Sequence, residues 1–331
     1  MAMAMAVAVF HPDRLRCSSS HKQQEFVSSA PELVLKKGGH NYWQWQEHKI
    51  HYVRQGHKGV PILLVHGFGA SVYHWRYNIP ELAKTHEVFA LDLLGFGWSD
   101  KALIEYDPQL WSRQIADFVK QVVKRPAVIV GNSIGGLTSL QTAVLYPDLV
   151  AALALVNPAG RFQSRKAQVI VEKPTKNTAG WPAFFKARDW ARREALLFVF
   201  KQLNQRSRIQ AALNNVYRDK SHVDEFLIDS ILEPAADPNA AEVFYRMISR
   251  FLFQPSDLSL EKLLRDLDCP LLVLWGESDP LAPSSKADKI QALYNDATLV
   301  KLQAGHCPHD EIPAQVNARL TSWIASLENL L

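Results

Sequence analysis

The chain has 331 residues, of which 47% are hydrophobic and 21% charged, and its formal net charge is +4. This composition is ordinary for a globular protein with a substantial core, and a net charge of this size does not by itself indicate nucleic-acid binding. Cys17, Cys269 and Cys307 are too widely spaced for a disulfide framework or a set of metal ligands, so we expect a reducing compartment.

The first 35 residues differ from the rest of the chain. Met1–Phe10 is apolar but far too short to span a bilayer, and the HPDRLRCSSSHKQQ segment after it is rich in Ser and basic residues, with Asp13 as its only acid. Low acidity with Ser and Arg is typical of organellar transit peptides. Over residues 1–35 we therefore expect a transit peptide or a disordered leader.

From about residue 40, short apolar strands alternate with helices. A hairpin of two strands is followed by continuous apolar runs, which are typical of parallel strands covered on both faces. The predicted strands are Tyr42–Gln46, Ile50–Arg54, Pro61–Val65, Glu87–Leu91, Ala127–Val130 and Val150–Val156, and the predicted helices cover 72–84, 108–124 and 134–146. This order predicts an α/β fold with a mostly parallel central sheet flanked by helices.

About a hundred residues with helical periodicity interrupt this alternation after Gly160. Strands return at Pro270–Trp275 and Ala297–Leu302, and a last helix is expected over Pro313–Leu330. We therefore expect a core over 40–160 and 265–331, with a helical cap over 161–264 inserted after the sixth strand.

The predicted cap is basic. Residues 161–220 hold 14 Lys/Arg against 4 Asp/Glu, interleaved with aromatic and aliphatic residues. This pattern suggests either a solvated cap that closes a pocket or a surface that docks on an anionic membrane. No recognised nucleic-acid motif accompanies the charge, so we expect no nucleic-acid partner.

A Gly-x-Ser-x-Gly motif at Gly131–Gly135 joins the fifth strand to a helix. This strand–turn–helix context is that of a nucleophile elbow, in which Ser133 occupies a strained turn that side chains at Gly131 and Gly135 would obstruct. An incidental serine in a strand-to-helix turn is the alternative.

An elbow serine needs a base and an acid that orients the base. His306 follows the last predicted strand and Asp279 follows the strand before it. Because parallel strands end along one edge of a sheet, Ser133, Asp279 and His306 are expected to converge there as a catalytic triad.

Other residues of suitable types lie nearby. His309 is the rival base, and Glu277 is a rival acid that is more readily interpreted as a turn residue. Asn157 stands after the sixth strand, where an acid would also fit, but an amide carries no charge. We interpret Asp92 and His66 as structural.

An oxyanion hole needs two backbone N–H donors. Ile134, directly after the nucleophile, supplies one, and we expect Phe68 of the His66–Gly69 loop to supply the other. The Phe68 side chain would also line the substrate pocket. Trp98 is expected either to line the pocket or simply to pack.

The motifs HGFG, DLLGFGWSD, GNSIGG, GESDP and GHCPH, in this order, resemble those of α/β-hydrolases over about residues 40–331. The segments HWRYNIPELA and GLTSL are similar to plant and cyanobacterial plastid-type hydrolases related to pheophytinase and chlorophyll dephytylase. That resemblance implies a chloroplast location, with the cytoplasm as the alternative, and an ester of a chlorophyll-type pigment as substrate. Ser133 disfavours the dehalogenase and epoxide hydrolase branches, whose nucleophile is an aspartate.

The sequence thus predicts a serine hydrolase that cleaves a carboxylic ester of a hydrophobic substrate, without a metal or organic cofactor. A ligand-binding or receptor protein on a hydrolase scaffold and a C–C bond hydrolase are the alternatives.

Overall fold

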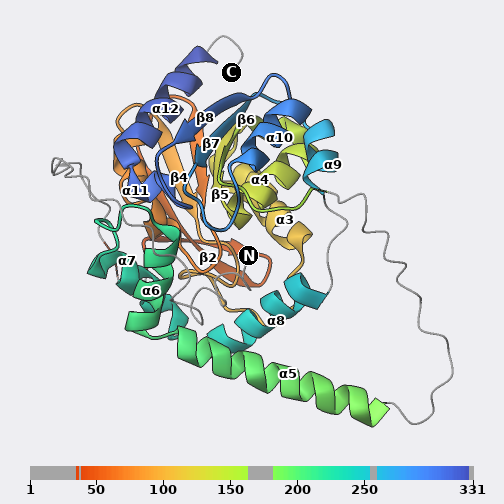
Figure 1. Ribbon diagram of the computed structural model, residues 1–331. Coiled ribbons are helices and arrows are strands. Elements are labelled where there is room, and N and C mark those ends of the chain that lie inside the picture. Colours follow the sequence, from red (N-terminus) through yellow and green to blue (C-terminus); the bar gives the residue numbers. More distant parts are fainter. Residues whose placement is uncertain (1–34, 37–38, 163–181, 254–258, 328–331) are drawn as a thin grey trace.

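The computed structural model describes residues 35–36, 39–162, 182–253 and 259–327, and Figure 1 shows how their elements are arranged. The leader expected over 1–35 lies, except for Leu35, outside these described residues. Much of the segment between the sixth strand and the cap, 163–181, lies outside them as well.

Eight strands form one sheet in the order β1-β2-β4-β3-β5-β6-β7-β8. β2 runs antiparallel to both of its neighbours, β1 and β4, and the other five adjacent pairs are parallel. The strands are β1 (Asn41–Trp45), β2 (His48–Gln55), β3 (Pro61–Val65), β4 (Glu87–Leu91), β5 (Ala127–Asn132), β6 (Val150–Val156), β7 (Leu271–Gly276) and β8 (Thr298–Leu302). The predicted α/β fold and its mostly parallel sheet are confirmed.

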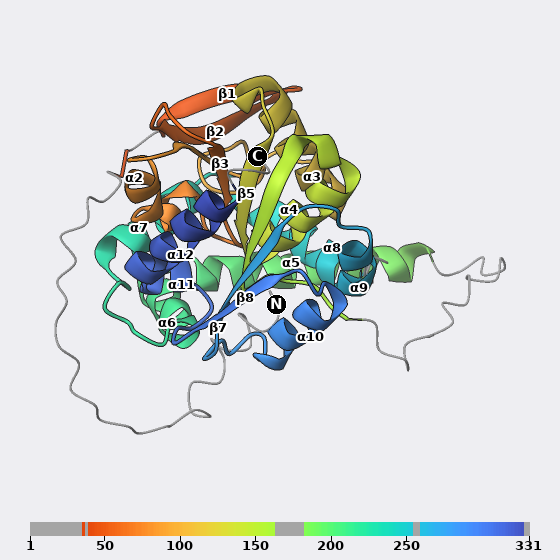
Figure 2. The same cartoon turned by 90° about the horizontal axis from the view of Figure 1, so that it is seen from above.

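Helices cover both faces of this sheet (Figure 2). On one face lie α3 (Pro108–Phe118), α4 (Ile134–Leu145), α9 (Leu260–Arg265) and α10 (Ser285–Leu293); on the other lie the 3-10 turn η1 (Val72–Trp75), α2 (Asn78–Leu82) and α12 (Pro313–Ser326). Two short elements, η3 (Pro147–Leu149) and α11 (Pro308–Glu311), precede β6 and α12.

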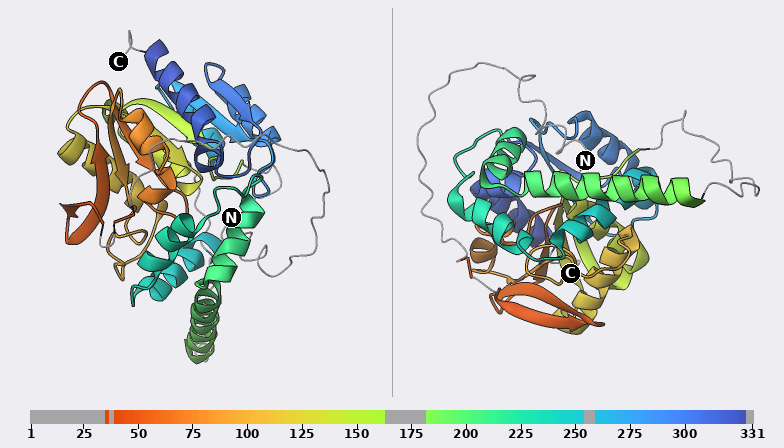
Figure 3. Two further views of the ribbon diagram at one scale, coloured as in Figure 1. Left: turned by 90° about the vertical axis from the view of Figure 1, so that its left-hand side faces the viewer. Right: turned by 90° about the horizontal axis from the view of Figure 1, so that it is seen from below.

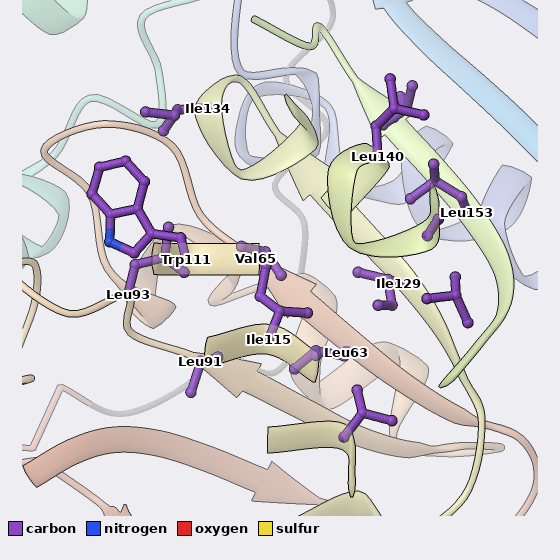
Figure 4. Close-up of a cluster of buried hydrophobic side chains, with 14 of the residues drawn as sticks. Leu63, Val65, Leu91, Leu93, Trp111, Ile115, Ile129, Ile134, Leu140 and Leu153 are labelled. Atoms are coloured by element: carbon purple, nitrogen blue, oxygen red, sulfur yellow. The ribbon is translucent and has the colours of Figure 1, made fainter. Parts of the chain in front are cut away.

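Strand residues alternate between the two faces because successive side chains of a strand point to opposite sides. Leu63 and Val65 of β3 pack toward α3 and α4, whereas Ile62 and Leu64 pack toward η1, α2 and α12. Figure 4 shows the first of these clusters, with Trp111 and Ile115 of α3 lying against the strand residues. Both faces are therefore dry, which explains why the strands read as uninterrupted apolar runs.

Two predicted helices differ in the structure from a single regular α-helix. The range expected as one helix over 72–84 consists of η1 and α2, because Pro80 has no N–H to bond the carbonyl four residues earlier and its ring crowds that carbonyl. The helix expected over 108–124 continues beyond α3 as a π-helical turn, η2 (Val119–Val123), which ends at Lys124 in a left-handed conformation.

The chain between β6 and β7 is helical where the structure describes it, as expected. Its elements are α5 (Pro182–Leu203), α6 (Arg206–Val216), α7 (Glu225–Ala235) and α8 (Ala240–Phe253), followed by α9. Figures 1 and 3 show α5 to α8 gathered at one end of the sheet, with α5 projecting beyond the rest. We call α5 to α8 the cap. Helix α9 begins inside the range expected for the cap, but its Leu260, Leu263 and Leu264 pack in the core cluster on the face of the sheet that α3 and α4 cover.

Candidate active site

Ser133 lies in the turn between β5 and α4 with φ 57° and ψ −118°, a conformation that L residues rarely adopt. The glycines on either side make this turn possible. A Cβ on Gly131 would lie 2.5 Å from the carbonyl oxygen of Gly135, and one on Gly135 would lie 2.4 Å from that of His66. The backbone approaches itself so closely here that only glycine fits, as the motif predicts.

His306 and Asp279 meet Ser133 at the same edge of the sheet. The His306 Nε2 atom lies 2.9 Å from Ser133 Oγ, and its Nδ1 lies 2.7 Å from Asp279 Oδ2. A carboxylate only accepts hydrogen bonds, so Nδ1 carries the proton and Nε2 offers its lone pair to the serine hydroxyl. All three side chains are buried. The structure thus brings together the three residues that chain order alone predicts.

Two asparagines hold this arrangement, and neither was predicted to do so. Asn157 Nδ2 donates to Asp279 Oδ2 at 2.8 Å, while its Oδ1 accepts from the Gly276 N–H at 2.8 Å. Asn132 Nδ2 donates to the carbonyl oxygens of Val156 and His306. The position of Asn157 directly after β6, next to the strand that precedes Asp279, is the sequence signal that points to this contact.

The expected oxyanion donors flank the serine. Ile134 is the first residue of α4, so its N–H has no acceptor within the helix. The loop that contains Phe68 passes close by, since a Cβ on Gly67 would lie 3.2 Å from Ser133 Cβ. Phe68 lines the cavity above Ser133. Both expected donors therefore belong to segments that lie beside Ser133.

The rival residues lie elsewhere. His309 is fully buried against Trp75, with ring centroids 4.1 Å apart, and neither of its ring nitrogens has a hydrogen-bond partner among the described residues. Burial holds its pKa well below the usual range, so it is neutral. Glu277 is exposed and accepts a hydrogen bond from Gln303. Neither side chain contacts the serine.

Asp92 and His66 organise the backbone beside the site. Asp92 accepts from the N–H groups of Val72 and Trp98 and pairs with His51 Nδ1 at 2.7 Å. Burial alone would raise the Asp92 pKa, but its interactions with His51 and these donors hold it below the usual value. His66 Nε2 accepts from the Leu93 N–H at 3.0 Å, and burial lowers its pKa. These contacts agree with a structural role for both residues.

Trp98 does not reach the cavity. Its ring packs edge-on against Tyr73, with centroids 5.2 Å apart, and lies 6.1 Å from the ring of His51. The neighbouring residues Phe96 and Gly97 line the cavity instead. The loop turns at Gly97, which has φ 49°, and Trp98 packs against the core on the face of the sheet that η1, α2 and α12 cover.

A cavity of about 230 Å³ opens above Ser133 between the sheet and the cap. Ser133 and His306 lie in its wall, together with polar Lys101 and Arg208. The Lys101 ammonium donates to the carbonyl oxygens of Gly97 and Ser99, and burial lowers its pKa to about 8. Most of the remaining wall is apolar, from Phe68, Phe96, Phe200, Leu203, Ile209, Ala212, Leu213, Val216, Ile231, Val243, Phe244 and Met247. Such a cavity suits a hydrophobic substrate.

The loop that contains His306 is bonded directly to the cap. The His306 N–H donates to the carbonyl oxygen of Val216 at 2.8 Å. Glu311 accepts from the N–H groups of Gly305, Arg218 and Asp219, at 2.8, 3.2 and 2.9 Å. The end of α6 therefore fixes the loop that contains His306, which we call the histidine loop.

A buried ion pair strengthens this connection. Arg76, which follows η1, bonds Asp310 at 2.9 Å and Asp224 of the cap at 2.8 Å. Tyr217 donates to Asp310 at 2.9 Å and lies 2.7 Å from His74 Nε2. Core, histidine loop and cap thus share one polar network.

Comparisons with known proteins agree with this fold. The model of the alpha/beta hydrolase fold family matches residues 60–313. The chain is similar to the chloroplastic pheophytinase of Arabidopsis thaliana, with 26% identity in an alignment of 340 positions that covers 89% of this chain and 68% of that protein. It is 30% identical over 262 residues to the 2-hydroxy-6-oxo-6-(2'-aminophenyl)hexa-2,4-dienoic acid hydrolase of Metapseudomonas resinovorans, covering 78% of this chain and 80% of the relative.

Two solved structures extend the comparison. A serine hydrolase involved in carbazole degradation superposes with a TM-score of 0.68 at 26% identity, over 86% of this chain and 98% of that one. A thermophilic esterase from Thermogutta terrifontis superposes with a TM-score of 0.62 at 22% identity, over 85% and 94% of the two chains. The second likeness, at this identity, concerns the fold alone.

Proposed function

Since this chain belongs to the alpha/beta hydrolase fold family, we propose that it cleaves a carboxylic ester through a Ser133–His306–Asp279 triad and an acyl-enzyme. The observation that carries the proposal is the continuous contact from Ser133 Oγ through the His306 ring to Asp279, at the base of an apolar cavity. Its family makes the protein a hydrolase of a small-molecule substrate.

In the first half-reaction, His306 Nε2 takes the proton from Ser133 Oγ as that oxygen attacks the ester carbonyl carbon. The N–H groups of Phe68 and Ile134 stabilise the oxyanion, each contributing roughly 3 kcal/mol to lowering the barrier. His306 then gives the proton to the departing alcohol. Water, deprotonated by the same nitrogen, releases the acid and regenerates the serine.

The apolar cavity supports a hydrophobic ester as substrate. The similarity to a pheophytinase supports, more narrowly, an ester of a chlorophyll-type pigment with a phytyl-like alcohol. That relative is chloroplastic, which supports the plastid location suggested by the basic, Ser-rich leader. A substrate of this kind partitions into membranes, and we propose that the protein meets it at an anionic bilayer through the basic cap. None of the helices in the described part of the chain has the length and apolar character needed to cross a membrane.

A second candidate is C–C bond hydrolysis by the same triad. It is favoured by the 30% identity to a hexadienoic acid hydrolase and by the likeness to the carbazole-degradation hydrolase. The two reactions differ in the leaving group, which is an alkoxide in one case and a carbanion in the other.

Covalent labelling with a fluorophosphonate probe tests the common mechanism. We expect labelling of the wild type and none of Ser133→Ala. Turnover of p-nitrophenyl esters and of a 2-hydroxy-6-oxohexa-2,4-dienoate then separates the two reactions, because an ester hydrolase leaves the dienoate intact. If folded wild-type protein is not labelled, the hydrolytic proposal fails and a ligand-binding or receptor role is favoured.

A further inference from the structure

One face of α5 carries large apolar side chains in solvent. Trp190 is 65% exposed and Phe198 63% exposed, and both exceed every other large apolar side chain among the described residues. Ala191 and Ala195 are exposed between these two side chains, which lie about two turns apart along the helix. We call these four residues the α5 stripe. Two large apolar side chains exposed within two turns of one helix make this face a candidate interaction surface.

The surroundings of the α5 stripe are basic. Residues 190–220 contain seven Lys/Arg and two Asp/Glu. One of the two acids, Glu194, is exposed on α5 between Trp190 and Phe198 and pairs with Arg193 at 2.9 Å. Lys201, at the end of the stripe, is exposed and forms no ion pair with any described carboxylate. This charge complements an anionic surface and disfavours association with a second copy of the same basic face.

The same helix forms a wall of the cavity. Phe200 and Leu203, on the face of α5 opposite to the stripe, line the cavity above Ser133. The Phe200 ring contacts that of Phe244 in α8, with centroids 5.3 Å apart. A surface bound to the α5 stripe is therefore separated from the cavity by the width of one helix.

We propose that the α5 stripe docks on an anionic lipid bilayer and that a hydrophobic ester passes from the bilayer beside α5 into the cavity. This inference rests on the proposed function for its second half only. Trp190 and Phe198 enter the boundary between headgroups and acyl chains, while Lys201 remains at the level of the phosphates. The helix lies in the plane of the interface, as an amphipathic anchor does.

The experiment measures flotation of the protein with phosphatidylcholine vesicles that contain, or lack, about one-third phosphatidylglycerol. We expect wild type to bind the anionic vesicles and the Trp190→Ala/Phe198→Ala variant to bind them at least about tenfold more weakly. Lys201→Gln should weaken binding about fivefold, and only to the anionic vesicles. The matched control is Leu103→Ala/Leu145→Ala, which removes two half-exposed leucines elsewhere and should bind as wild type does.

A soluble short-chain ester separates this proposal from the proposed function. The stripe variant should hydrolyse that ester as wild type does, yet lose at least about tenfold in rate on a long-chain ester held in the vesicles. Equal binding by wild type and stripe variant, or none by wild type, overturns the docking proposal. So does a wild-type dimer that becomes monomeric in the stripe variant. A wild type that binds vesicles but cleaves no ester contradicts the proposed function and leaves docking intact.

Discussion

The side-chain amide of Asn157 donates a hydrogen bond of 2.8 Å to Oδ2 of Asp279. The same oxygen accepts the proton on His306 Nδ1. Asn157 Oδ1 accepts a hydrogen bond from the Gly276 N–H, which fixes the orientation of the amide. The amide in turn holds the Asp279 carboxylate in the rotamer that faces the His306 ring. It is a positioning residue, since it acts on the base through Asp279.

Removal of this amide should lower the rate of the chemical step. Asn157 has φ 42°, so Asn157→Gly deletes the side chain while keeping a backbone that glycine adopts freely. We expect kcat on a soluble ester to fall about tenfold or more, the usual value of a hydrogen bond to a charged group, with KM unchanged. Lys124→Gly, another left-handed residue far from the site, should leave both parameters unchanged. A rise in KM at constant kcat would contradict the positioning role.

The nucleophile elbow should not tolerate a methyl group. In Gly131→Ala the new Cβ would lie 2.5 Å from a backbone oxygen that cannot move without unwinding α4, and we expect a loss of about 3 kcal/mol or more in the free energy of unfolding. The control is Gly69→Ala, where φ is 74° but no atom lies within 4 Å. There only backbone strain remains, about 1 kcal/mol. Urea denaturation measures both, and equal losses would show that the close approach is not what selects Gly131.

The buried histidines should make stability depend on pH. Burial lowers the pKa of His74 to about 4 and that of His309 well below its usual value. Both groups bind protons in the unfolded chain below about pH 6.5 but remain neutral in the folded chain, so stability falls as pH decreases from there toward 4. The slope is about 1.4 kcal/mol per pH unit for each histidine.

The His309→Phe variant tests this dependence. It keeps a ring against Trp75 and removes no hydrogen bond among the described residues. Urea denaturation at pH 7 and pH 5 should show a smaller loss of stability on acidification than in wild type. Replacement of the exposed His57 by Gln should leave that loss unchanged. An unaltered slope in His309→Phe would mean that this histidine is not neutral in the folded protein.

The cavity should limit the length of the substrate. Ala212 lines it from α6, and Ala212→Trp would fill much of its 230 Å³. We expect kcat/KM for long-chain esters to fall about tenfold or more, while esters with two to four acyl carbons remain within about twofold of wild type. Ala211→Trp, one position along on the exposed face of α6, is the matched control. Equal effects on short and long esters would place the hydrophobic group of the substrate outside this cavity.

The sheet and the three proposed catalytic residues follow from the sequence for one physical reason. Parallel strands end at one edge, so a loop after β5, one after β7 and one after β8 must lie side by side, whatever separates Ser133 from His306 along the chain. The glycines of the elbow are equally readable, since a turn this tight accepts no other residue. Local pattern and topology point in the same direction here.

Side-chain direction is harder to predict. Trp98 and Phe96 are two residues apart in an irregular loop, yet of the two only Phe96 lines the cavity. The sequence has no periodicity in this loop that would predict the turn at Gly97 between them. Because an amide carries no charge, Asn157 is not predicted as a site residue, yet its side-chain amide donates a hydrogen bond to Asp279. In the cap, helical periodicity identifies the helices but not the angles between them, which depend on contacts such as those between Phe200 and Phe244.

The bonds between the end of α6 and the histidine loop define where this protein can be recombined with its relatives. A cap transplanted from another hydrolase after β6 and before β7 would have to place a backbone carbonyl at the His306 N–H and two backbone N–H groups at the Glu311 carboxylate, as Val216, Arg218 and Asp219 do here. It would also leave the Arg76–Asp310 pair exposed to a foreign surface. Residues 305–311 and Arg76 thus form one contact network with the cap, although they lie outside it in the sequence. A chimera that changes the substrate range and keeps His306 in place must exchange the cap, residues 305–311 and Arg76 together.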